Sequence, residues 1–170
     1  MIRYFIRGLI DGSLSTLGIV IGASIASPLI IISAAFGGAL ANGFSNILGA
    51  FSAEYAIRYR EFRELERHML KKLSGTRLDE KTKKDIRKSG FLDGGATILG
   101  GLVPIIPFLL LDPAQALWVS ITAVVILMAL LGVLVGRLSK ESILWSVGKM
   151  VIFTAATAGV LLLVQYFMPV

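Results

Sequence analysis

The sequence contains no cysteine and only one histidine among its 170 residues. Without cysteine there is no disulfide, no zinc–thiolate or iron–sulfur site and no thiol nucleophile. The chain also shows no hydrolase triad, no phosphate-binding loop and no nucleotide-binding fingerprint. We therefore expect no enzymatic activity and no bound cofactor.

Charged residues are also scarce, and apolar residues take their place. Hydrophobic residues make up 55% of the chain, charged residues 16%, and the mean hydropathy is +0.79. A soluble domain of this length is more polar, so lipid is the expected surroundings of most of the chain. No polar linker is long enough to separate two cores, which predicts one domain with one polar insertion.

Apolar runs that cross a bilayer need about 20 residues, and the sequence has five of them. They cover residues of about 8–33, 35–57, 91–111, 114–137 and 143–168. Gly37-Gly38 and Asp112-Pro113 mark two tight connections. The first run has no small-residue cleavage site, so we interpret it as a retained span and not as a signal peptide.

These runs predict an all-α integral membrane protein with five transmembrane helices. Residues 1–57 and 90–170 form the predicted transmembrane bundle, and residues 58–89 form a short cytosolic helical excursion between spans two and three. In the excursion, Ala56 to Leu73 lacks glycine and proline and favours a helix that Gly75 ends. A second helix is predicted from Asp79 into the third span.

The basic residues orient this bundle. Of the seventeen Lys and Arg residues, two precede the first run, twelve lie between Arg58 and Lys88, and three surround the fourth connection. With five spans all three groups fall on one side, and the positive-inside rule assigns that side to the cytosol. We predict a multi-pass protein of a prokaryotic cell membrane with a cytosolic N-terminus and an outer C-terminus. The basic excess then indicates contact with membrane lipid and no nucleic-acid binding.

Three carboxylates lie just inside the predicted cytosolic face: Asp11, Glu54 and Asp93. A charge within a span costs roughly 2.5–3.5 kcal/mol on insertion scales, so each requires a reason. Asp11 and Asp93 can satisfy free backbone N–H groups at a helix start, which needs no substrate. Glu54 has no such role, although it can pair with Arg58, and it is the strongest single candidate for a site residue.

A polar stripe runs along the second span, because Asn42, Asn46, Ala50 and Glu54 recur every four residues. The stripe can line a transport pathway together with Asp11 and Asp93. Alternatively, its amides join helices by interhelical hydrogen bonds.

The excursion holds a candidate metal site. Glu61, Glu64 and His68 share one helix face with Glu54, and carboxylates with one imidazole suit Mn²⁺ or Fe²⁺. The alternative is a solvated helix with ion pairs such as Arg60 with Glu64.

Glycine and proline predict how the spans pack. The motif at residues 8–13, Gly-Leu-Ile-Asp-Gly-Ser, returns at residues 90–95 as Gly-Phe-Leu-Asp-Gly-Gly. A parallel repeat of helix pairs produces such an echo, and so does a shared preference for Asp-Gly at helix starts. Small residues permit close helix crossings, and Pro104 with Pro107 predicts a kink in the third span.

Three segments carry a resemblance to a known family. Asp11-Gly12 with Leu17-Gly18, Gly49 to Tyr55, and Gly100 to Pro104 with Pro107 resemble the vacuolar iron transporter family, in a small prokaryotic-type member. The resemblance implies a homodimer that exports Fe²⁺, and also Mn²⁺, from the cytosol in exchange for protons, with the pathway at the dimer interface. It implies that Asp11 and Glu54 are pathway residues. Ala50 stands where the family has a methionine.

Elementary chemistry supports such an exchange. Carboxylates partly removed from water hold protons, whereas a divalent cation binds their ionised form, so metal entry and proton release are linked. Two alternatives stay open: a membrane structural or regulatory protein whose basic excursion binds anionic lipid or a partner protein, and a transporter of another solute.

Overall fold

The computed structural model describes residues 1–167, which fold into six α-helices with no β-strand among them. The helices are α1 (Ile2–Gly22), α2 (Pro28–Met69), α3 (Arg77–Leu102), α4 (Ile106–Leu110), α5 (Pro113–Ser139) and α6 (Ile143–Phe167). Four of them, α1, α2, α5 and α6, are long and apolar enough to cross a membrane. The prediction of an all-α chain is confirmed.

The first connection lies earlier in the chain than predicted. Helix α1 ends at Gly22 and α2 begins at Pro28, so the turn falls at residues 23–27, and Gly37-Gly38 lies inside α2. Proline lacks an N–H and has a fixed φ, which suits the first helical position. Glycines in an apolar helix keep their backbone hydrogen bonds, since no other partner is available in lipid. The predicted boundaries at residues 33 and 35 are therefore wrong.

The predicted third span, residues 91–111, is divided between two helices. Helix α3 ends at Leu102, three residues form a turn, and α4 begins at Ile106. Proline removes a backbone donor, so a carbonyl near the break needs another partner. The Ser120 hydroxyl of α5 supplies it, donating to the Pro104 carbonyl oxygen at 2.7 Å. The break is thus stabilised by the neighbouring helix.

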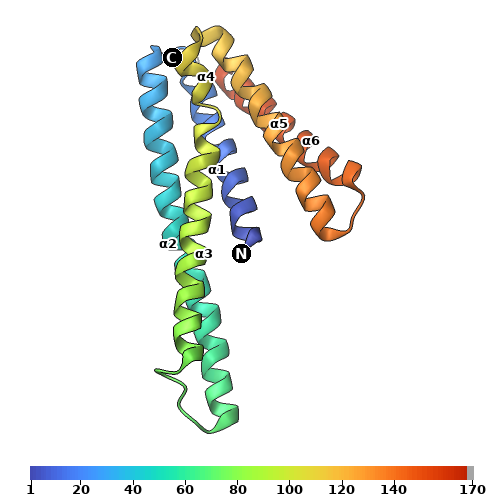
Figure 1. Cartoon of the computed structure of the whole chain (residues 1–170). Coiled ribbons are helices and arrows are strands. Elements are labelled where there is room, and N and C mark those ends of the chain that lie inside the picture. The colour runs from blue at the N-terminus through green and yellow to red at the C-terminus, as the bar shows by residue number, and fades with distance from the viewer. Residues whose placement is uncertain (168–170) are drawn as a thin grey trace.

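Helix α1 lies at the centre of the bundle (Figure 1). One apolar core joins it to α5 and α6 through Leu17, Val124 and Ala158. A second core joins it to α2 and to the segment around α4 through Val20, Ile31 and Ile105. Figure 1 shows α2 and α3 running on together beyond the N-terminus as a hairpin, while α5 and α6 form a second hairpin.

Glycine allows α1, α2 and α3 to pack in direct backbone contact. A Cβ at Gly8 or Gly12 of α1 would collide with backbone carbonyl oxygens of α3, and one at Gly94 of α3 would collide with α2. In each copy of the repeated motif, glycines therefore pack against a neighbouring helix: α3 for the first copy and α2 for the second. This close approach brings short polar side chains from three helices within hydrogen-bonding distance.

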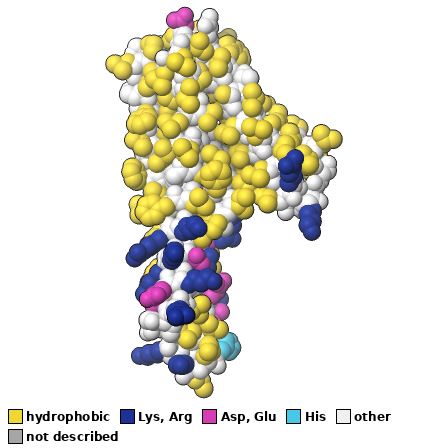
Figure 2. Space-filling view, in the orientation of Figure 1, with side chains coloured by type: hydrophobic (Ala, Val, Ile, Leu, Met, Phe, Trp, Pro, Cys, Tyr) yellow, Lys and Arg dark blue, Asp and Glu magenta, His cyan; other side chains and the backbone are white. Residues whose placement is uncertain are grey.

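Charge and apolar surface are separated along the molecule. Figure 2 shows Lys and Arg on the α2–α3 hairpin and at the lower tip of the α5–α6 hairpin, whereas the body above is covered by hydrophobic side chains. Figure 1 places the N-terminus at the same end as these two basic regions. The chain is thus built as a membrane protein with one basic end.

Candidate functional site

Asp11 is the centre of a polar network inside the bundle. Its Oδ2 accepts hydrogen bonds from Asn42 Nδ2 at 2.9 Å and from Asn46 Nδ2 at 2.6 Å. The same Asn42 nitrogen lies 2.9 Å from Ser15 Oγ, and that of Asn46 lies 2.8 Å from Thr97 Oγ1. Helices α1, α2 and α3 each contribute to this network, so it depends on the glycine contacts between them.

The structure rules out the interpretation of Asp11 and Asp93 as helix caps. Helix α1 begins at Ile2 and α3 at Arg77, so both aspartates lie well inside their helices. At these positions the backbone N–H groups already bond to carbonyls of the same helix. The reason for two carboxylates in an apolar bundle must therefore lie in tertiary contacts.

A groove gives access to Asp11 from the side of the bundle. It has a volume of about 540 Å³ and runs between α1 and α6, where Arg7, Asp11, Ser15, Thr157 and Leu161 are among its lining residues. The lining combines one carboxylate, two hydroxyls and one guanidinium with apolar walls. Such a groove can accommodate a small hydrated cation beside the Asp11 carboxylate.

Glu54 is held by the N-terminal end of α1. It is only 3% exposed, and its carboxylate accepts from Arg3 Nη2 at 2.7 Å, from the Tyr4 hydroxyl and from Arg58. The pairing with Arg58 confirms one predicted partner. Arg3 and Tyr4 were missed, because only the folded bundle brings the start of α1 beside the middle of α2.

Asp93 forms its ion pair with a residue that is distant from it in sequence. It is fully buried, and both of its oxygens bind the guanidinium of Arg7, with Nε at 3.2 Å from Oδ1. The Thr97 hydroxyl donates to the Asp93 backbone carbonyl at 2.9 Å, which connects this pair to the Asn46 network. The structure thus brings Asp11, Asn42, Asn46 and Asp93 together, with Glu54 in a separate ion cluster.

The candidate metal residues of the excursion do not converge. Glu61, Glu64 and His68 are exposed, and Glu64 binds Arg60 Nε at 3.1 Å, as the alternative predicted. Glu54 faces α1 instead. Across residues 1–167 there is no group of three or more His, Asp or Glu side chains close enough to hold a metal ion. Metal binding by these four residues stays a prediction.

The turn of the α2–α3 hairpin has its own electrostatic anchor. The buried Asp79 carboxylate accepts from the Gly75 backbone N–H at 3.0 Å and from Lys83 Nζ at 2.9 Å. The pKa of Asp79 lies below its ordinary value, chiefly because the Gly75 N–H donates to the carboxylate and also because Lys83 does. The same pair raises the pKa of Lys83. The turn is therefore held in place by a charged group.

Comparison with known proteins adds two findings. The model of a family described as the VIT family matches residues 56–166. An uncharacterized protein of Methanocaldococcus jannaschii is 46% identical over 160 residues, which cover 92% of this chain and 84% of the relative. The family match spans the excursion and all helices after it, whereas the similarity to the archaeal protein extends over nearly the whole chain.

Proposed function

Because the chain belongs to the VIT family, whose members are membrane transporters of metal ions and not enzymes, we propose that it moves Fe²⁺, and also Mn²⁺, out of the cytosol in exchange for protons. The observation that carries this proposal is the hydrogen-bond environment of Asp11. It is a carboxylate within the bundle whose hydrogen-bond donors are neutral amides.

The three carboxylates differ in how their charge is compensated. Glu54 and Asp93 are bound by guanidinium groups, whereas Asp11 has no Lys or Arg nitrogen within 4.0 Å among residues 1–167. The guanidinium that lines the Asp11 groove, that of Arg7, is bound to Asp93, so the Asp11 carboxylate keeps room for a cation. Binding of a metal ion to a carboxylate in competition with protons is the elementary step of metal–proton exchange.

The groups around Asp11 suit a cation that prefers oxygen. Amide orientation follows from the hydrogen-bond network, and turning the amides of Asn42 and Asn46 would present their Oδ1 atoms beside the Asp11 carboxylate. The hydroxyls of Ser15 and Thr97 lie within the same network. Such a set suits Mn²⁺ and Fe²⁺, and Ala50 leaves the stripe without a sulfur ligand that would favour softer ions.

We assign Glu54 and Asp93 to the cytosolic mouth of the pathway. Both are bound by arginines of the first two turns of α1, Glu54 by Arg3 and Asp93 by Arg7. A cation that reaches either carboxylate has to displace a guanidinium. The N-terminal end of α1 would then act as a gate that opens when a cation takes the place of an arginine.

The same proposal includes five membrane crossings. The second half of α3 together with α4 would form the crossing that joins the hairpin to the start of α5, and the charged first half of α3 would remain in the cytosol. The basic end of the molecule, with the N-terminus and the two hairpin tips, supports this orientation (Figures 1 and 2). Residues 58–89 are then the cytosolic excursion.

We further propose a homodimer with the pathway at its interface, as the family resemblance implies. The outer face of α2 supports it, since exposed apolar side chains such as Leu29, Phe36, Phe44 and Leu48 require a cover of lipid or protein.

Metal flux into vesicles tests this function. Purified protein would be reconstituted in liposomes that contain a metal-sensitive dye, and entry of Fe²⁺ and Mn²⁺ would be measured for wild type and Asp11→Asn. Asp112→Asn is the matched control, because Asp112 is exposed at the start of α5 and its side chain makes no cap hydrogen bond.

We expect flux for wild type and Asp112→Asn, and the rate of empty vesicles for Asp11→Asn. Wild-type flux in the Asp11 variant would refute this site. A folded wild type that moves neither ion would refute metal transport and favour another solute or a structural role.

A further inference from the structure

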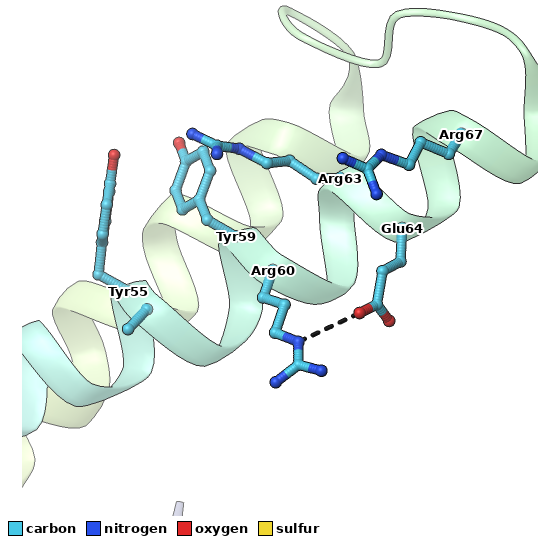
Figure 3. A pocket seen from close by; sticks show the side chains of 7 residues that line it. Tyr55, Tyr59, Arg60, Arg63, Glu64 and Arg67 are labelled. Atoms are coloured by element: carbon cyan, nitrogen blue, oxygen red, sulfur yellow. Dashed lines mark hydrogen bonds and ion pairs between the residues drawn. The ribbon is translucent and has the colours of Figure 1, made fainter.

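One face of the α2 extension combines aromatic and basic side chains. Tyr55, Tyr59, Arg63 and Arg67 follow one another every four residues, and we refer to them as the Tyr–Arg stripe. They line a groove of about 490 Å³. Figure 3 shows the two tyrosines and Arg63 on the same side of the helix, with Arg63 extended toward Tyr59.

The positive charge of the stripe is not compensated by an ion pair in the part of the chain that the structure describes. Arg60, on the other side of the groove, is bound by Glu64, as the dashed line in Figure 3 marks. For Arg63 and Arg67, by contrast, no carboxylate oxygen lies within 4.0 Å in residues 1–167. Two guanidinium groups one helical turn apart form a site for an anion, and guanidinium binds phosphate through two parallel hydrogen bonds.

The depth of the stripe matches the headgroup layer of a membrane. Exposed apolar side chains on α2 are frequent as far as Ile57, and beyond it Leu65 and Met69 stand among charged residues, which places the edge of the hydrocarbon near Ile57. Arg63 lies about 9 Å and Arg67 about 15 Å further along the helix, and the headgroup layer is about 5–8 Å thick. Helical side chains lean toward the helix N-terminus, here toward the membrane, so a long arginine reaches back into that layer.

The tyrosines belong to the same interface. The rings of Tyr55 and Tyr59 lie 4.4 Å apart between centroids, and tyrosine is enriched where membrane meets water. On their other side lies a second groove of about 300 Å³, lined by Lys83 and Arg87 of α3 as well as the two rings. Basic side chains therefore flank the aromatic pair on both sides.

We propose that the Tyr–Arg stripe binds the phosphate of an anionic lipid headgroup in the leaflet that surrounds the base of the hairpin. A second copy of this chain is a poor occupant of this face, because a symmetric contact would set arginines against arginines. The headgroup site does not depend on metal transport, and a lipid bound here would anchor the base of the hairpin to the membrane.

Native mass spectrometry of the full-length protein in nonionic detergent tests the site. Dioleoylphosphatidylglycerol would be titrated in, with dioleoylphosphatidylcholine as the zwitterionic comparison and inorganic phosphate as the free anion. The variant is Arg63→Gln with Arg67→Gln. The matched control is Lys81→Gln with Lys84→Gln, which removes the same charge from exposed positions on α3.

We expect wild type and control to retain phosphatidylglycerol over phosphatidylcholine. We expect the arginine variant to bind it about 25-fold more weakly, since each of the two basic residues contributes about fivefold near an anionic surface. An equal loss in the control would show general charge attraction and overturn the site. Equal binding by the arginine variant would overturn it too. Displacement of the lipid by millimolar phosphate would identify a free-anion site and overturn the lipid assignment.

Discussion

Asp11, Glu54 and Asp93 carry the same charge within one bundle, yet their surroundings differ. Glu54 and Asp93 accept hydrogen bonds from arginines, whereas Asp11 accepts them from two asparagines. Guanidinium groups occupy the oxygens of Glu54 and Asp93, while the neutral amides beside Asp11 leave its charge open to an incoming cation. The three residues therefore differ in the side chains that bind them, although all three are carboxylates.

Removing the Glu54 carboxylate should destabilise the bundle. In Glu54→Ala the Tyr4 hydroxyl loses its buried acceptor and Arg58 its ion pair, and the loss of a buried charged hydrogen bond costs about 1.5–3 kcal/mol. We expect the thermal unfolding midpoint in detergent to fall by several degrees. Glu61→Ala is the control, since Glu61 is exposed. Equal midpoints for the two variants would show that the Glu54 cluster contributes nothing to stability.

The sequence identified the polar residues of the site but not all their partners. The four-residue spacing of Asn42, Asn46 and Glu54 places them on one face of a helix whatever the tertiary structure. The contact of Glu54 with Arg3 joins residues 51 positions apart, and only helix packing determines it. The cap interpretation of Asp11 failed because α1 begins at Ile2, in a stretch whose two arginines suggested a flanking segment outside the helix.

At the scale of helices, the contact between α1 and α3 positions the Asp11 network. Gly12 faces the backbone carbonyl of Thr97, and a methyl group there would force the two helices apart. We expect Gly12→Ala to lower the unfolding midpoint and to impair transport. Gly95→Ala provides the control, because nothing lies within 4 Å of a Cβ built at Gly95. Equal melting and transport in the two variants would contradict this role of α1–α3 packing.

The α2–α3 hairpin should depend on pH through Asp79. Because the pKa of Asp79 is lower in the folded protein than its ordinary value of 3.8, its contribution to stability is present above that value and is lost as the pH falls through the lowered pKa. Wild type should therefore melt above Asp79→Ala at neutral pH, and the difference should vanish well below pH 3.8. A difference that grows on acidification would contradict this sign. Thermal melting of both proteins across pH measures it.

Element boundaries were predictable where a strong local signal stands alone. Asp112-Pro113 correctly marked the start of α5, and Gly75, with φ of 78°, lies in the predicted turn. At the first connection the glycine pair indicated a turn, but the turn lies before Pro28. In an apolar helix glycine is tolerated, whereas proline after a polar residue is a start signal. The division of α3 from α4 follows from the proline pair, as predicted.

For the whole molecule, the segregation of basic residues to one end implies an orientation in the membrane. The absence of cysteine permits a direct test, since any introduced cysteine is the only thiol. We expect a membrane-impermeant maleimide to label Gln115→Cys in intact cells and to label Ser74→Cys only after the cells are opened. Labelling of both in intact cells, or the reverse pattern, would contradict the proposed orientation. Both positions are exposed.

In the proposed mechanism one carboxylate, Asp11, exchanges a metal ion for protons. The most direct measurement follows metal entry and lumenal pH together in liposomes that contain a metal-sensitive dye and a pH dye, with Mn²⁺ outside and no imposed pH gradient. Metal entry through wild type should drive protons in the opposite direction, and Asp11→Asn should abolish both signals. Metal entry without proton movement, or either movement preserved in Asp11→Asn, would contradict the account.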